Sequence, residues 1–396
     1  GNGTINQTGG SVITNPGSGS IFMGEGNSQA LWDLSGGTAT ANILVVGWRG
    51  GSNELRVRGD GVLTSGHINI GEGNGGKAIV NQSGGTITSN AWIAVGIGSA
   101  EQAEYNLSGG TTNTLGFEVA DTQGIVRVSG TGTLNANVIE MPTRNGTGVF
   151  EISGGTVNTT DFLQGGRDGN TLGSGVTNQS GGTVNVNRNL VVQRPGVGTG
   201  AYHLSGGTLS VNGAIDGTLG TFTFTGGEIT RSTPGEIIFN GNLTTGAPAA
   251  TLGLDGDKTF LINGALDNSA GLTLELTGLG IPDQPLPLSA PATGSFVLGN
   301  IGTVPAAGSF DIGRTFDRGF DATFNGLGQS TIIATRINED APFNPLTQSV
   351  YWLDEDGGTV TLQYSVIPEP GSAALASLAG LLLLLKHRPR RNRRSI

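Results

Sequence analysis

The sequence predicts an all-β fold, more narrowly a parallel β-helix (β-solenoid) of about ten coils with about 24 residues per coil. A short block centred on Gly-Gly recurs from residue 9 to residue 226. Apolar and polar residues alternate beside each block, as they do in strands with one buried face. Glycine makes up 72 of the 396 residues, more than twice its usual share of about 7%.

The Gly-Gly block sets the period of the predicted coil. Ten copies place their first glycines 20 to 27 residues apart, with a mean of about 24. Propeller blades need about 40 residues or more, and the leucine frame of leucine-rich repeats is absent. We therefore expect one solenoid turn per block over residues 1–232. Eight blocks begin at Thr8, Ser35, Ser83, Ser108, Ser153, Ser180, Ser205 and Thr225, and two degenerate ones are Gly59–Gly61 and Ser129–Gly132.

Each coil is predicted to contain three short strands in a fixed order. The first ends at the Gly-Gly, as in Tyr105-Asn106-Leu107, and the second is a β-branched run such as Thr183–Val186. The third ends at another glycine, as in Ile93–Gly96, and glycine suits corners where stacked backbones come close. The residues just before the blocks should form one inward column: Leu34, Leu107, Val128, Ile152, Leu204 and Phe224, with Gln7, Gln82 and Gln179 pairing in a ladder or bonding the backbone.

The composition changes near Ser232, because three prolines precede this residue and twelve follow it. The four-proline segment Ile281–Pro291 is predicted to be a loop. We expect residues 233–365 to form an irregular β-rich region that caps the solenoid, whose open end would otherwise expose strand edges. Its predicted strands are Glu236–Asn240, Thr259–Asn263, Leu272–Thr277, Gly294–Leu298, Thr331–Thr335, Val350–Leu353 and Thr359–Val366.

The last thirty residues combine three features in order. Pro368-Glu369-Pro370 precedes an apolar stretch, Gly371–Leu385, which we expect to form a hydrophobic helix. A basic tail follows, with Lys386, Arg388, Arg390, Arg391, Arg393 and Arg394. Residues 366–396 resemble the PEP-CTERM sorting signal of exported bacterial proteins. The resemblance implies a partner enzyme, an exosortase, which is a membrane protein that cleaves its substrates and passes them toward the cell surface.

The physical chemistry of this tail favours the same orientation. Basic residues beside a hydrophobic helix stay cytoplasmic, so residues 1–367 should lie outside. Fifteen residues rise only about 22 Å as a helix, short of a hydrocarbon core of about 30 Å, which suits a transient anchor. An ordinary C-terminal membrane anchor is the alternative. The chain begins Gly1-Asn2-Gly3, so we expect that a leader was removed or that the N-terminus is truncated.

Charge and cysteine usage exclude several classes of function. Six of the 20 basic residues lie in the basic tail, and Glu369 is the last acid. Residues 1–370 therefore carry 14 basic and 30 acidic groups, a net charge of −16, which disfavours nucleic-acid binding. The chain contains no cysteine, which excludes disulfides, thiolate metal sites and cysteine nucleophiles.

A search for catalytic or metal-binding groups predicts none, and no cofactor is expected. The acids of the solenoid, among them Glu54, Glu104 and Glu151, lie at unlike coil positions with no recurring acidic pair beside a base. The histidines are isolated, without the spacing of metal ligands. Acidic turns at Asp255–Asp257 and Asp354–Gly358 could bind Ca²⁺, although solvated turns of this kind are commoner.

These observations predict an exported, non-enzymatic bacterial surface or extracellular-matrix protein. Its β-helical stalk is similar to the passenger regions of autotransporter adhesins. Exopolysaccharide or other surface glycans are the expected ligands, and the C-terminal helix is expected in the inner membrane before processing or permanently. The alternative is a β-helix polysaccharide lyase or hydrolase that acts on extracellular glycans. The sequence leaves the particular glycan and the oligomeric state open.

Overall fold

The computed structural model describes residues 2–366 with several gaps. The gaps are 16–17, 73–74, 99–101, 120, 143–144, 166–171, 197, 256–257, 268–271, 278–291, 304–309, 312–349 and 357–358. The Pro-Glu-Pro motif, the apolar stretch and the basic tail lie outside the described residues, as do the predicted strand Thr331–Thr335 and the loop Ile281–Pro291. All structural statements below concern the described residues.

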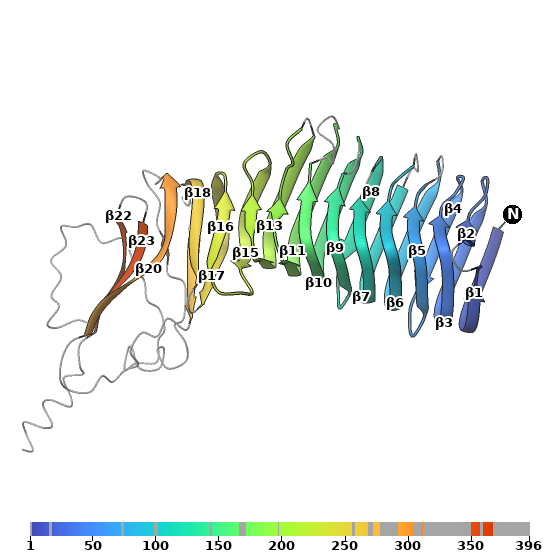
Figure 1. Cartoon of the computed structure of the whole chain (residues 1–396), viewed down its shortest axis with the longest axis horizontal. Helices are drawn as coiled ribbons and strands as arrows, with labels where there is room; N and C mark the ends of the chain where they lie inside the picture. Colours follow the sequence, from blue (N-terminus) through green and yellow to red (C-terminus); the bar gives the residue numbers. More distant parts are fainter. Residues whose placement is uncertain are drawn as a thin grey trace, which may run out of the picture.

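The described chain winds into a parallel β-solenoid of about ten coils, which confirms the predicted fold (Figure 1). Each coil contributes a stretch to three faces. The first face holds the stretches that end at the Gly-Gly, such as 103–107, and the second face holds those just after it, such as 111–114. The third face holds the stretches beyond the next corner, such as 116–119. The strands run perpendicular to the long axis of the rod, so each coil rests on the one before it (Figure 1).

The strands differ in how much of a coil they cover. Longer ones are β1 (Asn2–Ile13), β3 (Gln29–Val46), β6 (Lys77–Val95), β7 (Gln102–Val119), β10 (Thr147–Gln164), β11 (Ser174–Val186), β13 (Thr199–Val211), β15 (Thr221–Thr230) and β17 (Leu243–Asp255). Shorter ones are β2 (Ser20–Met23), β4 (Ser52–Val57), β5 (Val62–Ile70), β8 (Gln123–Val128), β9 (Thr133–Met141), β12 (Leu190–Val191), β14 (Ala214–Asp216), β16 (Glu236–Asn240), β18 (Thr259–Asp267) and β19 (Leu272–Thr277). Four more follow: β20 (Ala292–Thr303), β21 (Phe310–Asp311), β22 (Val350–Asp356) and β23 (Thr359–Val366).

The register of the first face stacks equivalent residues of successive coils directly above one another. The predicted inward column is confirmed, since its apolar members and its glutamines are all at least nine-tenths buried. Alternate residues of each stretch point outward, so the hydrophobic core is a continuous strip along the rod axis. The column runs Gln7, Leu34, Val57, Gln82, Leu107, Val128, Ile152, Gln179, Leu204 and Phe224.

Parallel pairing continues beyond residue 232, the boundary suggested by the proline content. Strand β15 pairs with β17, β16 with β18 and β17 with β19, all parallel. Farther along the chain, β20 pairs antiparallel with β23, which also pairs antiparallel with β22. The capping role of residues 233–365 and the C-terminal helix remain predictions.

The Gly-Gly corners allow the coils to approach closely. Gly110 has a φ of +79°, and a Cβ placed there would lie 2.5 Å from the backbone of Gly84 in the preceding coil. Gly10 has a similar φ of +70° but belongs to the first coil, and a Cβ there would meet nothing within 4 Å. The second glycine of the block therefore satisfies two separate requirements, a left-handed backbone and an empty space for the neighbouring coil.

Two buried glutamines of the column bond both backbone and side chains of the next coil, and the third, Gln7, donates to the Thr38 carbonyl. Gln179 Nε2 donates to the carbonyl of Thr208 at 3.0 Å, and the Tyr202 hydroxyl donates to Gln179 Oε1 at 2.6 Å. Gln82 Nε2 likewise donates to the carbonyl of Thr111 at 3.0 Å, while its Oε1 accepts from Tyr105. The expectation that the glutamines reach backbone groups is confirmed, and the tyrosine partners were not foreseen.

The two corner glycines generate a testable pair of variants. Gly10→Ala should cost about 1–2 kcal/mol of unfolding free energy, because only the left-handed backbone is strained. Gly110→Ala should cost about 1–3 kcal/mol more, because its methyl group also collides with the preceding coil. Chemical denaturation of both variants measures the difference. If both variants lost the same unfolding free energy, the close approach of the coils would not be the reason for the second glycine of the block.

The glutamine–tyrosine pair allows a second stability test. Tyr202→Phe should lower the free energy of unfolding by about 1–3 kcal/mol, because Gln179 Oε1 then loses its hydroxyl donor inside the core. Adding Gln179→Leu should recover most of this loss, since leucine already occupies the same column in other coils. Thermal and urea unfolding of the two variants check the result. A double variant less stable than Tyr202→Phe would contradict it.

Candidate functional site

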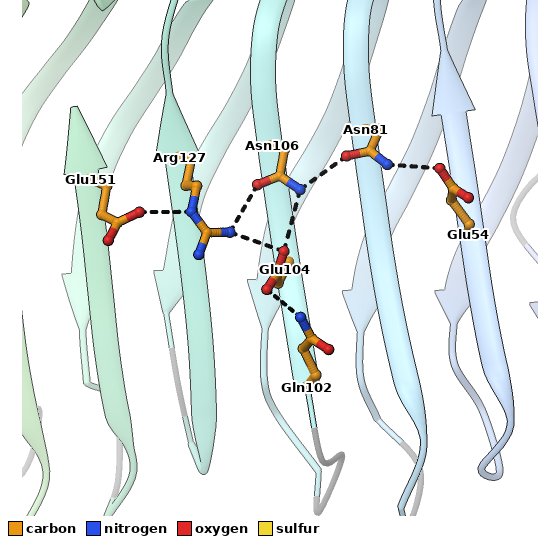
Figure 2. A network of polar contacts seen from close by, with 7 residues as sticks. All are labelled: Glu54, Asn81, Gln102, Glu104, Asn106, Arg127 and Glu151. Carbon is orange, nitrogen blue, oxygen red and sulfur yellow. Dashed lines mark hydrogen bonds and ion pairs between the residues drawn. The ribbon is translucent and has the colours of Figure 1, made fainter. Parts of the chain in front are cut away.

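A network of polar side chains crosses the outer surface of the first face. Figure 2 shows these residues, whose strands pair in succession, with hydrogen bonds that link each coil to the next. The Asn81 amide donates to Glu54 Oε1 at 2.7 Å, and the Asn106 amide donates to Asn81 Oδ1 at 2.9 Å. The remaining members are Gln102, Glu104, Arg127 and Glu151. Because these residues occupy outward positions of neighbouring strands, the coil period alone brings them together.

Arg127 is the centre of the network. Its Nη1 donates to Glu104 Oε2 at 2.9 Å in the preceding coil, and its Nε donates to Glu151 Oε2 at 2.7 Å in the following coil. The guanidinium also donates to Asn106 Oδ1 at 3.2 Å. The Glu104 side chain is 12% exposed, whereas those of Arg127 and Glu151 are 39% and 44% exposed. One cation therefore bridges two carboxylates that lie two coils apart.

The protonation of Glu104 follows from its surroundings. Partial burial raises its pKa, but the hydrogen bond from Gln102, the charge of Arg127 and the bonds from Asn106 and Arg127 together hold this pKa below its ordinary value of 4.5. The pKa of Glu54 is also lowered, chiefly by its hydrogen bond from Arg56. Both carboxylates are therefore anions at neutral pH. A general acid for glycosidic cleavage needs the opposite shift, so this electrostatic pattern favours an ion-pair ladder.

Opposite charges one coil apart recur elsewhere on the rod. Arg58 Nε donates to Asp33 Oδ1 at 2.8 Å, and Arg188 bonds the carboxylate of Asp161. The sequence analysis placed the acids at unlike coil positions and so missed these combinations. That placement is wrong for Glu54 and Glu104, which the strand register sets at the same position two coils apart. The signal was available, because Glu104, Arg127 and Glu151 are 23 and 24 residues apart, which is the coil period.

The other residues singled out in the sequence form no cluster. His203 Nδ1 lies 3.1 Å from the Thr223 hydroxyl on the first face. Among the residues that the structure describes, no group of three His, Asp or Glu side chains is placed to hold a metal ion. The acidic turns at 255–257 and 354–358 fall partly outside the described residues. The sorting motif Pro368, Glu369 and Pro370 and the basic tail lie outside them entirely.

A groove of about 380 Å³ runs beside the corner between the second and third faces, and we call it the asparagine groove. Its outward second-face residues are Asn113, Asn135, Asn158, Asn185 and Ser210. Buried neighbours are Thr114, Ala136, Thr159 and Val186. Corner residues complete the lining: Asn137, Thr160, Asn187, Asn212 and Ser232. The lining contains no charged and no aromatic side chain.

The four second-face asparagines of the groove form a hydrogen-bonded ladder. After the first, Asn113, each Nδ2 donates to the asparagine Oδ1 of the preceding coil: Asn135 to Asn113 at 2.9 Å, Asn158 to Asn135 at 2.8 Å and Asn185 to Asn158 at 2.8 Å. The corner residues are fixed as well, since Asn212 donates to Asn187 and accepts from Ser232. The sequence analysis did not single out this ladder, although its members follow the first glycine of their blocks by four residues, or by five for Asn135.

No family model, no curated protein and no solved structure matches this chain. Within the described part of the chain, no helix has the length and apolar character that a membrane crossing requires.

The Arg127 network predicts a pH-dependent contribution to stability. Because the folded pKa of Glu104 is lowered, its stabilising effect is present above the unfolded pKa and is lost as the pH falls through the folded pKa. Arg127→Met should therefore lower the free energy of unfolding by up to about 1 kcal/mol at pH 7, and the difference should shrink below about pH 4. Urea denaturation at several pH values measures this difference.

The matched control is Arg49→Met, which removes a wide 3.7 Å contact with Glu25 between two well-exposed side chains and a cation–π contact with Trp48 at the surface. This control should leave stability almost unchanged at every pH. The difference in unfolding free energy between wild type and Arg127→Met should therefore depend on pH. An equal difference at pH 7 and pH 3 would contradict the assignment of the network as a charge ladder.

Proposed function

We propose that this protein is an exported, non-enzymatic surface or extracellular-matrix protein whose β-helical rod is delivered by the C-terminal sorting signal. The observation that carries this proposal is the continuity of the rod. Coil follows coil with the same three faces, and Arg127 on the first face pairs with carboxylates of the coils before and after it. Such an array serves as a spacer and a repetitive binding surface, because ten coils at about 4.8 Å each span about 48 Å.

The delivery step rests on the order of features in the tail. Recognition by an exosortase-type enzyme requires Pro368, Glu369 and Pro370, and the basic tail from Lys386 to Arg394 keeps the chain end on the cytoplasmic side. The apolar stretch holds the protein in the inner membrane until cleavage. After processing, the body carries the net charge of −16 on the cell surface or in the extracellular matrix.

A β-helix lyase or hydrolase that acts on glycans is the second candidate, and the asparagine groove is the observation that favours it. This groove gives a polysaccharide a place to lie along the rod. Its lining holds no carboxylate, histidine, lysine or arginine, which are the groups that acid–base cleavage of a glycan uses. The described geometry therefore supports binding more than turnover.

The sorting proposal predicts the fate of two variants in a host that carries the exosortase. Replacing Pro368, Glu369 and Pro370 with alanine should leave the full-length protein in the inner membrane with the basic tail still attached. Replacing the six basic residues of the tail with serine should instead impair membrane retention, because nothing then opposes passage of the short apolar segment. Cell fractionation and mass spectrometry of the C-terminus measure both outcomes.

The two variants also separate a sorting signal from a simple membrane anchor. A simple anchor would be insensitive to the first change and would respond only to the second. If the triple-alanine protein reached the surface with wild-type size and yield, the exosortase assignment would be wrong.

A further inference from the structure

We propose that the asparagine groove binds a linear, uncharged polysaccharide chain that lies along the rod axis. This inference rests on the proposed function at the cell surface and deepens it by assigning the binding site and the chemical class of the glycan. The groove draws its lining from successive coils, from Asn113 to Ser232. A ligand that fills it must therefore be extended and repetitive.

The asparagine ladder leaves hydrogen-bonding capacity for a ligand. A primary amide has two N–H donors and two acceptor lone pairs. In the ladder, Asn135 and Asn158 each use one N–H toward the preceding coil and one lone pair toward the following coil. One donor and one acceptor per amide remain. A hydroxyl group, which both donates and accepts, is the natural partner for such a pair.

The ladder also fixes the amides before a ligand arrives. All three ladder bonds run in the same direction, from Nδ2 of one coil to Oδ1 of the coil before it. Little side-chain freedom is then lost on binding, which is a cost that flexible side chains would incur. The remaining donors and acceptors repeat once per coil, at about 4.8 Å. A linear chain of pyranose units likewise presents hydroxyl groups repeatedly along its length.

The charge of the site selects neutral over acidic glycans. The lining contains no basic side chain that could compensate a uronate or sulfate. The net charge of −16 on residues 1–370 adds long-range repulsion for polyanions. Beside the corner residues Thr160 and Asn187, Arg188 pairs with Asp161.

Peptide strands fit this groove less well. A peptide that extends a sheet needs a free strand edge, whereas the groove lies across strands whose backbone groups already bond neighbouring coils. Recognition of peptide side chains would need apolar or aromatic pockets, and the lining has no aromatic side chain. The same absence of stacking platforms predicts weak binding per site, which becomes useful when many copies engage one polymer.

The test uses the full chain and cellohexaose as the neutral probe, with an oligogalacturonate of the same length as the acidic probe. Isothermal titration should show binding of cellohexaose and none of the oligogalacturonate. The double variant Asn135→Ala/Asn158→Ala should weaken binding at least tenfold, because it removes two neighbouring amides of the ladder. Unchanged length of the recovered cellohexaose distinguishes binding from hydrolysis.

The matched control is Asn240→Ala. This residue also accepts an amide bond from the next coil, from Asn263 at 2.9 Å, but it lies on the third face outside the groove. The Asn240→Ala protein should bind cellohexaose with the same affinity as the wild type. If the ladder variant fails to fold, hydrogen exchange of the wild-type protein answers the same question, since the probe should slow exchange at corner residues 137, 160 and 187.

Three results would overturn the proposal. They are no binding of cellohexaose, equal binding by the wild type and the ladder variant, and preference for the acidic probe. None of these results bears on whether the protein is exported and processed, which fractionation measures separately. Conversely, a protein that binds cellohexaose through the groove but stays in the cytoplasm would refute the surface role alone.

Discussion

The close stacking of coils at the Gly-Gly corners is the constraint on which the rest of the structure depends. Each coil can rest on the next only where the corner has no side chain, as the 2.5 Å approach at Gly110 shows. Once the corners are aligned, every side chain has its equivalent about 4.8 Å away in the neighbouring coils. Buried columns then become continuous core, and polar columns become ladders. The glutamines, the Arg127 network and the asparagine ladder are three results of this one repeat.

Much of this architecture could be predicted from sequence, because the period and the alternation are local signals. The inward column from Leu34 to Phe224 required only the offset from each Gly-Gly block. The pairing of Gln82 with Tyr105 and of Gln179 with Tyr202 was missed, although both pairs are 23 residues apart. Contacts between coils are visible only when every outward position, basic and amide as well as acidic, is aligned on the repeat.

The asparagine groove could not be predicted in the same way. The ladder follows the blocks at a nearly regular offset, but the hollow is also lined by the corner residues Asn137, Thr160 and Asn187. Nothing in the repeat pattern indicates that these corner residues enclose a groove. Parallel pairing also continues past Ser232, where the proline content rises, into β17, β18 and β19. Composition describes the loops there, whereas pairing is decided by the strands between them.

The most direct test of the stacked-coil account is a set of distances along one outward column. The chain has no cysteine, so spin labels can be attached specifically to two double-cysteine variants. One carries cysteine in place of Asn81 and Asn178, and the other in place of Asn81 and Thr223. These partners lie four and six coils from Asn81 in the first face. Double electron–electron resonance should give a distance between the labels that is about 10 Å longer for the second pair, because two more coils of about 4.8 Å each separate them. Equal separations, or a shorter one for the second pair, would contradict a parallel solenoid.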